Sequence, residues 1–273
     1  MRNWKIVASA AIQAPKTAPI LLQGKLEEVL KNACTLGYNG VEYHTRENAD
    51  IDYDAVIDIM QKNNVEISSI ITGRLFTEGG YSMLNDDPEN AKGAMDGMVK
   101  YINMASKLGT DLVLGWAKGQ VPAGAVRSEY LDRLGGMLRE LEVTAKEKNV
   151  KINIEVINRY ETNLFNTAKE TCDFLDKQKL EQCYAHLDTF HMNIEELDML
   201  EAIRLTGDRL GYFHLADNTR WYPGSGVLDF EKILSTLDDV GYDGYLSVEC
   251  LPKEDSTATA ELALKNLLAI IGK

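Results

Sequence analysis

The chain has 273 residues, of which 45% are hydrophobic, and a formal net charge of −13 at pH 7. An acidic excess of this size repels polyanions and argues against nucleic acid or an anionic membrane surface as a partner. No secretory signal pattern is evident, and no apolar run approaches the ~20 residues of a membrane-spanning helix. We therefore expect a cytoplasmic protein that acts on a small molecule.

Strand and helix patterns alternate along the chain. Short apolar runs rich in β-branched residues predict strands, and apolar residues spaced by three and four predict helices. In chain order, strands are expected at 4–10, 40–44, 65–71, 111–116, 151–157, 183–187, 210–215 and 245–250. Helices are expected at 26–36, 52–64, 89–108, 130–148, 167–176, 194–205, 230–240 and 258–271.

A long loop at residues 72–88 interrupts this alternation. Loops of this length in compact domains are usually lids or binding elements. Elsewhere the connections are shorter, and no break in composition marks a linker. We therefore expect one domain over residues 1–273.

Eight strands alternating with eight helices predict an α/β fold of the (β/α)₈ TIM-barrel type. A doubly wound sheet is the alternative. That fold should carry a glycine-rich turn after its first strand, where this chain reads ASAAIQAP. The barrel is therefore favoured.

In such a barrel the active site lies at the carboxyl ends of the strands. The stretch HLDTFHMN at 186–193 places Asp188 and His191 at one such end, where the strand is expected to give way to a loop. Polar residues also follow the other strands, most densely in the second half of the chain. They are Glu42, His44, Arg46, Thr72, Arg74, Lys118, Glu155, Asn158, Arg159, Glu161, His214, Asp217, Arg220 and Glu249.

Four of these residues occupy equivalent places on four consecutive strands: Glu155, Asp188, His214 and Glu249. Each is flanked by apolar residues, and buried carboxylates brought together need a compensating cation. Three carboxylates and one imidazole suit Mn²⁺ or Mg²⁺, with Co²⁺ as a further candidate. The competing interpretation is that each carboxylate has its own salt bridge at the barrel end.

Other residues carry weaker signals. His44 is interpreted as a structural polar group, and His186 is expected to point away from the site because side chains alternate along a strand. Lys118 and Arg74 are either solvated loop charges or substrate contacts. The PGSG sequence at 223–226 is interpreted as a tight turn in preference to a phosphate cradle.

Four segments together carry a family resemblance: NIEVINRYETN (153–163), LDTFHMNIEE (187–196), FHLADNTRWYPGSG (213–226) and LSVEC (246–250). They resemble the ketose 3-epimerases of the D-tagatose and D-psicose type, in the xylose-isomerase-like sugar isomerase/epimerase superfamily. The loop 72–88 and the sequence SVECLP are also similar to the 5-keto-L-gluconate epimerase type. The resemblance covers the second half of the chain closely and the first half in pattern only.

The resemblance implies roles for particular residues. Asp217 stands where the family more often has a glutamate, three residues after the metal-binding histidine, and we expect it and Lys118 to contact the substrate. His191 lies a turn beyond the metal ligand on the same segment and is expected to hold substrate oxygens. The full implied set is Glu155, Asp188, His214 and Glu249 for one divalent metal, usually Mn²⁺, and Glu161, His191 and Arg220 for the ketose oxygens.

The implied reaction inverts C3 of a ketose or keto-sugar acid through a cis-enediolate. Glu155 and Glu249 are the natural acid/base pair, since a proton must leave one face and return to the other. An aldose–ketose isomerase of the hydroxypyruvate or xylose type, or a lyase acting on 3-oxo-glycosides, would share the intermediate. A three-zinc endonuclease is disfavoured by the chain's four histidines, and a vestigial sugar-binding barrel would bind no metal. Relatives form dimers or tetramers, so a homo-oligomer is expected.

Overall fold

Nine parallel strands form the central sheet in the computed structural model, which describes residues 3–253 and 255–272. Eight of them close into a barrel, because the first strand pairs with the last from Lys5 opposite Tyr245. The strands are β1 (Lys5–Ala11), β2 (Leu22–Gln23), β3 (Gly40–His44), β4 (Glu66–Ile71), β5 (Asp111–Leu114), β6 (Ile152–Glu155), β7 (Cys183–Asp188), β8 (Leu210–Leu215) and β9 (Tyr245–Val248).

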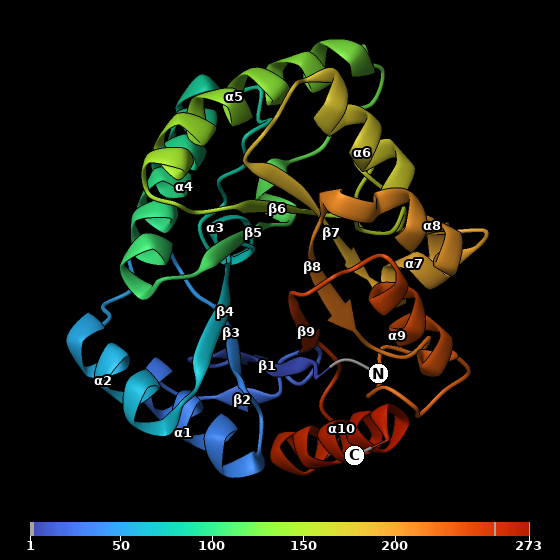
Figure 1. Ribbon diagram of the computed structural model, residues 1–273. Helices are drawn as coiled ribbons and strands as arrows, with labels where there is room; N and C mark the ends of the chain where they lie inside the picture. The colour runs from blue at the N-terminus through green and yellow to red at the C-terminus, as the bar shows by residue number, and fades with distance from the viewer. Residues whose placement is uncertain (1–2, 254, 273) are drawn as a thin grey trace.

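Helices surround the barrel on its outside (Figure 1). They are α1 (Leu26–Leu36), α2 (Tyr53–Asn63), α3 (Arg74–Thr77), α4 (Pro88–Leu108), α5 (Arg127–Glu147), α6 (Ala168–Lys177), α7 (Thr189–Glu195), α8 (Met199–Thr206), α9 (Phe230–Asp239) and α10 (Ser256–Ile271). Two 3₁₀ turns, η1 (Trp116–Lys118) and η2 (Gly207–Arg209), complete the set. This arrangement confirms the predicted (β/α)₈ barrel.

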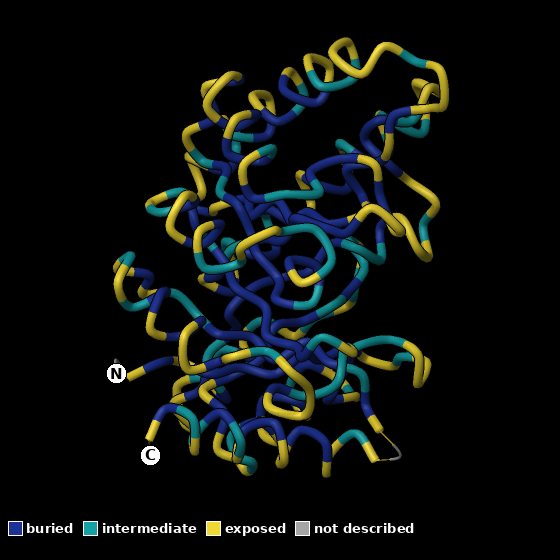
Figure 2. Tube along the Cα trace, turned by 90° about the vertical axis from the view of Figure 1, so that its right-hand side faces the viewer, coloured by how far each residue is buried: buried dark blue, intermediate teal, exposed yellow. Residues whose placement is uncertain are grey.

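The strands are buried on both faces, as parallel barrel strands must be. Figure 2 shows the central strands buried, while the outer turns of the helices are exposed. The helices begin and end where local signals dictate. Asp87 caps α4, which has Pro88 in its first turn, and the helix ends at Gly109 with a φ of 67°. None of the helices in the described part of the chain is long and apolar enough to cross a membrane.

Three local predictions are wrong. The segment after Asp188 is a helix, because the Asp188 carboxylate accepts hydrogen bonds from the backbone of Phe190 and His191 and caps α7. The predicted helix at 194–205 is therefore divided between α7 and α8. The long loop at 72–88 contains the short α3. In addition, a short ninth strand that was not predicted, β2, lies between β1 and α1 and pairs with Ala10 and Ala11.

Candidate metal and sugar site

The four residues aligned in the sequence meet at the carboxyl end of the barrel. Glu155 ends β6, Asp188 ends β7, His214 is the penultimate residue of β8, and Glu249 directly follows β9. One ligand atom from each lies within 4.8 Å of one from every other member, and all four residues are buried. Parallel strand ends converge on one rim, which is why residues far apart in sequence form one cluster.

His214 is oriented from below by Glu42, a residue whose role the sequence analysis missed. Glu42 Oε2 lies 2.7 Å from His214 Nε2, and both side chains are fully buried. Burial opposes ionisation of Glu42, but His214 and His44 hold its pKa well below the usual range. Tyr212 also donates a hydrogen bond to this carboxylate, at 3.1 Å. With Nε2 directed at the Glu42 carboxylate, Nδ1 is the ring nitrogen that faces Asp188 and Glu249.

The free atoms point at one another. His214 Nδ1 lies 3.5 Å from Asp188 Oδ2 and 3.4 Å from Glu249 Oε2. Neither His214 Nδ1 nor Asp188 Oδ2 has a hydrogen-bond partner among the described residues. A buried polar atom without a partner is costly, and two of them in one oxygen-rich cluster form the donor set of a divalent cation. The residues therefore fit the metal that the sequence implies.

Arg220 pairs with two members of the cluster from the loop that follows β8. Its Nη1 lies 3.0 Å from Asp188 Oδ2, and its Nη2 donates a hydrogen bond to Glu249 Oε2. Its guanidinium also stacks over the Phe190 ring at 4.7 Å. Burial raises the pKa of Asp188, but Arg220 and neighbouring histidines hold it well below its ordinary value. Arg220 thus brings a fixed positive charge to the rim of the site.

His191 and Glu161 form a second polar group beside the cluster. Nε2 of His191 lies 3.3 Å from Arg220 Nη1 and 4.0 Å from Glu155 Oε1. Its other nitrogen contacts the Asn158 amide at 2.7 Å, and Asn158 also donates to Glu161 Oε1 at 2.8 Å. Burial lowers the pKa of His191 to about 4, so the ring is neutral at pH 7. His191, Asn158 and Glu161 therefore form a connected group of one neutral ring, one amide and one carboxylate beside the cluster.

Glu155 differs electrostatically from the other carboxylates. Burial and the nearby Glu249 carboxylate raise the pKa of Glu155 to about 8. The absence of a side chain at Gly115 leaves room for the Glu155 carboxylate, because a Cβ at Gly115 would lie 2.5 Å from Glu155 Oε2. Perturbed carboxylates in a cleft are common among catalytic acids and bases.

The side chains of Lys118 and Asp217 form hydrogen bonds with backbone groups of the protein. Lys118 is fully buried in η1, so it is not a solvated loop charge, and its ammonium donates to the carbonyls of Gly115 and Glu155 at 3.1 and 3.3 Å. Burial lowers its pKa to about 8. The Asp217 carboxylate accepts hydrogen bonds from the backbone of Gly224 and Gly226. The PGSG segment is therefore a turn, as predicted, and it is held by Asp217.

His186 corrects the sequence analysis, because it points into the barrel and not away from the site. The register shift between β7 and β8 falls between Ala185 and His186, so the alternation from His186 to Asp188 is unbroken. The ring packs edge-on against His214 with centroids 4.1 Å apart, and neither nitrogen has a hydrogen-bond partner among the described residues. Burial lowers the pKa of His186 well below its ordinary value, so it is a neutral floor beneath the cluster.

A parallel barrel with a carboxylate and histidine cluster at its carboxyl end defines a class of metal-site barrels. The family model described as "Xylose isomerase-like TIM barrel" matches residues 30–268. The chain belongs to this family, as its motifs indicated.

Within this family, the chain is similar to several proteins named as sugar epimerases. The L-ribulose 3-epimerase of Methylomonas sp. (strain DH-1) is 30% identical over 230 residues, which cover 83% of this chain and 79% of the relative. The D-psicose 3-epimerase of Enterocloster bolteae is 43% identical over 125 residues, 46% of this chain and 42% of the relative. The apo structure of 3-keto-D-glucoside 4-epimerase from E. coli shares the fold with a TM-score of 0.83 and 21% identity, over 98% of this chain and all of that one.

Proposed function

We propose that this protein is a divalent-metal-dependent sugar epimerase that inverts C3 of a ketose or keto-sugar acid through a cis-enediolate. The convergence of Glu155, Asp188, His214 and Glu249, with two ligand atoms lacking hydrogen-bond partners, carries the proposal. Relatives named as ketose 3-epimerases support the reaction type.

The proton transfers are assigned to Glu155 and Glu249. These carboxylates come from β6 and from the residue after β9, so they approach the site from strands that are not neighbours in the barrel. One removes the proton beside the ketone as a base, and the other returns a proton to the opposite face as an acid. The raised pKa of Glu155 suits a group that exchanges a proton near neutral pH.

The remaining residues position the substrate. When bound at Glu155, Asp188, His214 and Glu249, a divalent metal supplies positive charge that stabilises developing negative charge on substrate oxygens. Glu161, His191 and Arg220 would hold the hydroxyls near the carbonyl. We assign supporting roles to Lys118 and Asp217, because their polar atoms already serve backbone groups. Mn²⁺ is the ion we propose, since oxygen ligands with one imidazole suit it.

Isotope labelling tests the reaction type. The metal-reconstituted protein is incubated in D₂O with a panel of ketohexoses, keto-acids and ketose phosphates, and the products are mapped by NMR. Deuterium at C3 with a C3-epimeric product is expected. Deuterium at C1 with an aldose product would replace the proposal by an aldose–ketose isomerase, and an eliminated product would indicate a lyase. Metal analysis should find one equivalent per chain.

A further inference from the structure

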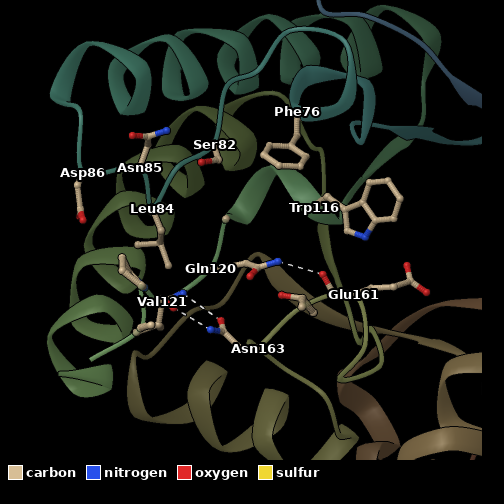
Figure 3. Close-up of a pocket in the computed structure, with 14 residues that line it drawn as sticks. Phe76, Ser82, Leu84, Asn85, Asp86, Trp116, Gln120, Val121, Glu161 and Asn163 are labelled. Atoms are coloured by element: carbon tan, nitrogen blue, oxygen red, sulfur yellow. Dashed lines mark hydrogen bonds between the residues drawn. The ribbon is translucent and has the colours of Figure 1, made fainter. Parts of the chain in front are cut away.

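A cavity lies beside the candidate metal cluster, bounded by the loops that follow β4, β5 and β6. Its volume is about 870 Å³, within the range of pockets that bind drug-sized ligands. Figure 3 shows Phe76 and Trp116 along one side and Leu84 and Val121 along the other. The two aromatic side chains are 43% and 41% exposed, so their rings present a large apolar area to a ligand.

The walls of this cavity are held in place by hydrogen bonds between loops. The backbone of Val121 exchanges two bonds with the Asn163 side chain, at 3.0 and 2.7 Å. Gln120 donates to the carbonyl of Glu161 at 3.0 Å, which joins the loops after β5 and β6. Met83 and Leu84 bond to the backbone of η1. A pocket built this way is preformed, which reduces the entropy cost of binding.

The charges of the lining disfavour an anionic ligand. Asp86 and Glu161 contribute carboxylates, and the described lining contains no lysine or arginine. Its remaining polar groups are the hydroxyls and amides of Ser82, Asn85 and Gln120, among others. A neutral ligand rich in hydroxyl groups matches these polar side chains. The C–H face of a sugar ring can also pack on the aromatic side chains of the wall.

Glu161 connects the cavity to the reacting centre. It lines the cavity, while its Oε1 lies 4.0 Å from His191 Nδ1 in the polar group beside the metal cluster. The four cluster residues themselves do not line the cavity. A ligand with one sugar ring at the cluster and a second ring in the cavity would pass Glu161 between them.

We propose that this cavity is a subsite for a neutral glycosyl group, so that the substrate is a keto sugar carrying a second sugar ring. The inference rests on the proposed function for the position of the reacting ring. The second ring would pack on Phe76 and Trp116 and exchange hydrogen bonds with the amides opposite them. A glycosyl subsite also accounts for the two exposed aromatic side chains in the cavity wall, because exposing a concave apolar surface to water is otherwise unfavourable.

Titration calorimetry on the Mn²⁺-loaded protein tests the subsite directly. The probes are D-fructose and three glucosyl-D-fructoses, with glucose attached at O4, O5 or O6. At least one disaccharide should bind about tenfold more tightly than D-fructose. Ala123→Trp places a large side chain in the cavity from an exposed lining position. In this variant the disaccharide should bind about as tightly as D-fructose and no more. Val143→Trp on the exposed face of α5 is the matched control and should preserve the preference for the disaccharide.

Equal binding of D-fructose and all three disaccharides would overturn the subsite, as would a preference that survives Ala123→Trp. Because calorimetry needs no turnover, failure of the two ideas can be told apart. Preferential binding without epimerisation of any probe would refute the proposed reaction but keep the subsite. Epimerisation of D-fructose without a preference for any disaccharide would keep the proposed reaction but refute the subsite.

Discussion

The two halves of the barrel rim use charge differently. In the half after β1 to β4, two arginines each pair with a carboxylate close by in sequence, Arg46 with Glu47 at 2.7 Å and Arg74 with Glu78 at 2.6 Å. In the half after β6 to β9, buried carboxylates converge and share Arg220 and His214. Local pairs neutralise themselves, whereas the convergent set leaves ligand atoms directed at a common point.

A cavity in the first half differs in chemistry from the cavity that is bounded by the loops after β4, β5 and β6. This cavity in the first half, of about 860 Å³, is lined by both Arg46 and Arg74 and by several carboxylates. Their mutual pairing leaves little net attraction for an anionic group. The convergent half is therefore distinguished by buried ligand atoms that face one another and not by the number of charges.

The largest effect is expected from a carboxylate in the convergent half. Glu155→Gln should lower turnover about 10²–10⁴-fold, because an amide cannot exchange the proton. Calorimetry should still detect substrate binding. Glu78→Gln, in a self-neutralised pair, is the control and should change turnover less than about twofold. Near-normal activity of Glu155→Gln would eliminate the two-base mechanism.

A smaller effect is expected from the carboxylate beneath the site. Glu42→Gln should weaken metal binding about 10–100-fold in titration calorimetry, since Glu42 fixes the ring orientation and basicity of His214. Tyr212→Phe removes the donor to Glu42 and a hydrogen bond to Ser68, leaves the Glu42 carboxylate in place, and should cost less than about fivefold in metal affinity. Unchanged metal affinity in Glu42→Gln would show that His214 does not need a negatively charged partner.

Gly115 tests how closely Glu155 must be placed. In Gly115→Ala the new methyl group would displace the Glu155 carboxylate, and kcat/KM should fall about tenfold, because small displacements of reacting groups are costly. Gly136→Ala in α5 meets no close contact and should instead raise the free energy of unfolding by about 0.5–1 kcal/mol. Equal activity of both variants would mean that Glu155 has room to move.

The smallest effect is expected in the self-neutralised half. Arg74→Ala should change the free energy of unfolding by about 1 kcal/mol, because it removes a partly exposed ion pair with Glu78 and a hydrogen bond to the Gln13 carbonyl. The KM for neutral ketoses should stay within about twofold. A tenfold rise in KM confined to keto-sugar acids would show that Arg74 anchors a substrate carboxylate, and would erase the contrast between the halves.

Much of the fold was predictable because strand and helix periods are local properties of the sequence. The strand from Leu210 to Leu215 was predicted at its observed bounds, and most other elements within a few residues. The convergence of Glu155 and Glu249 followed from barrel geometry, which brings every strand end to one rim. The α7 helix was missed because its cap, Asp188, also belongs to the cluster and was interpreted only as a ligand.

The sequence by itself therefore determined the barrel and the four clustered residues, because hydrophobic periodicity and strand-end position are encoded locally. Tertiary structure decided which atoms face one another. Glu42 meets His214 across 172 residues, His186 turns inward through strand register, and the aromatic cavity is assembled from three loops. Such contacts depend on side-chain direction and on packing between distant segments, which no local pattern records.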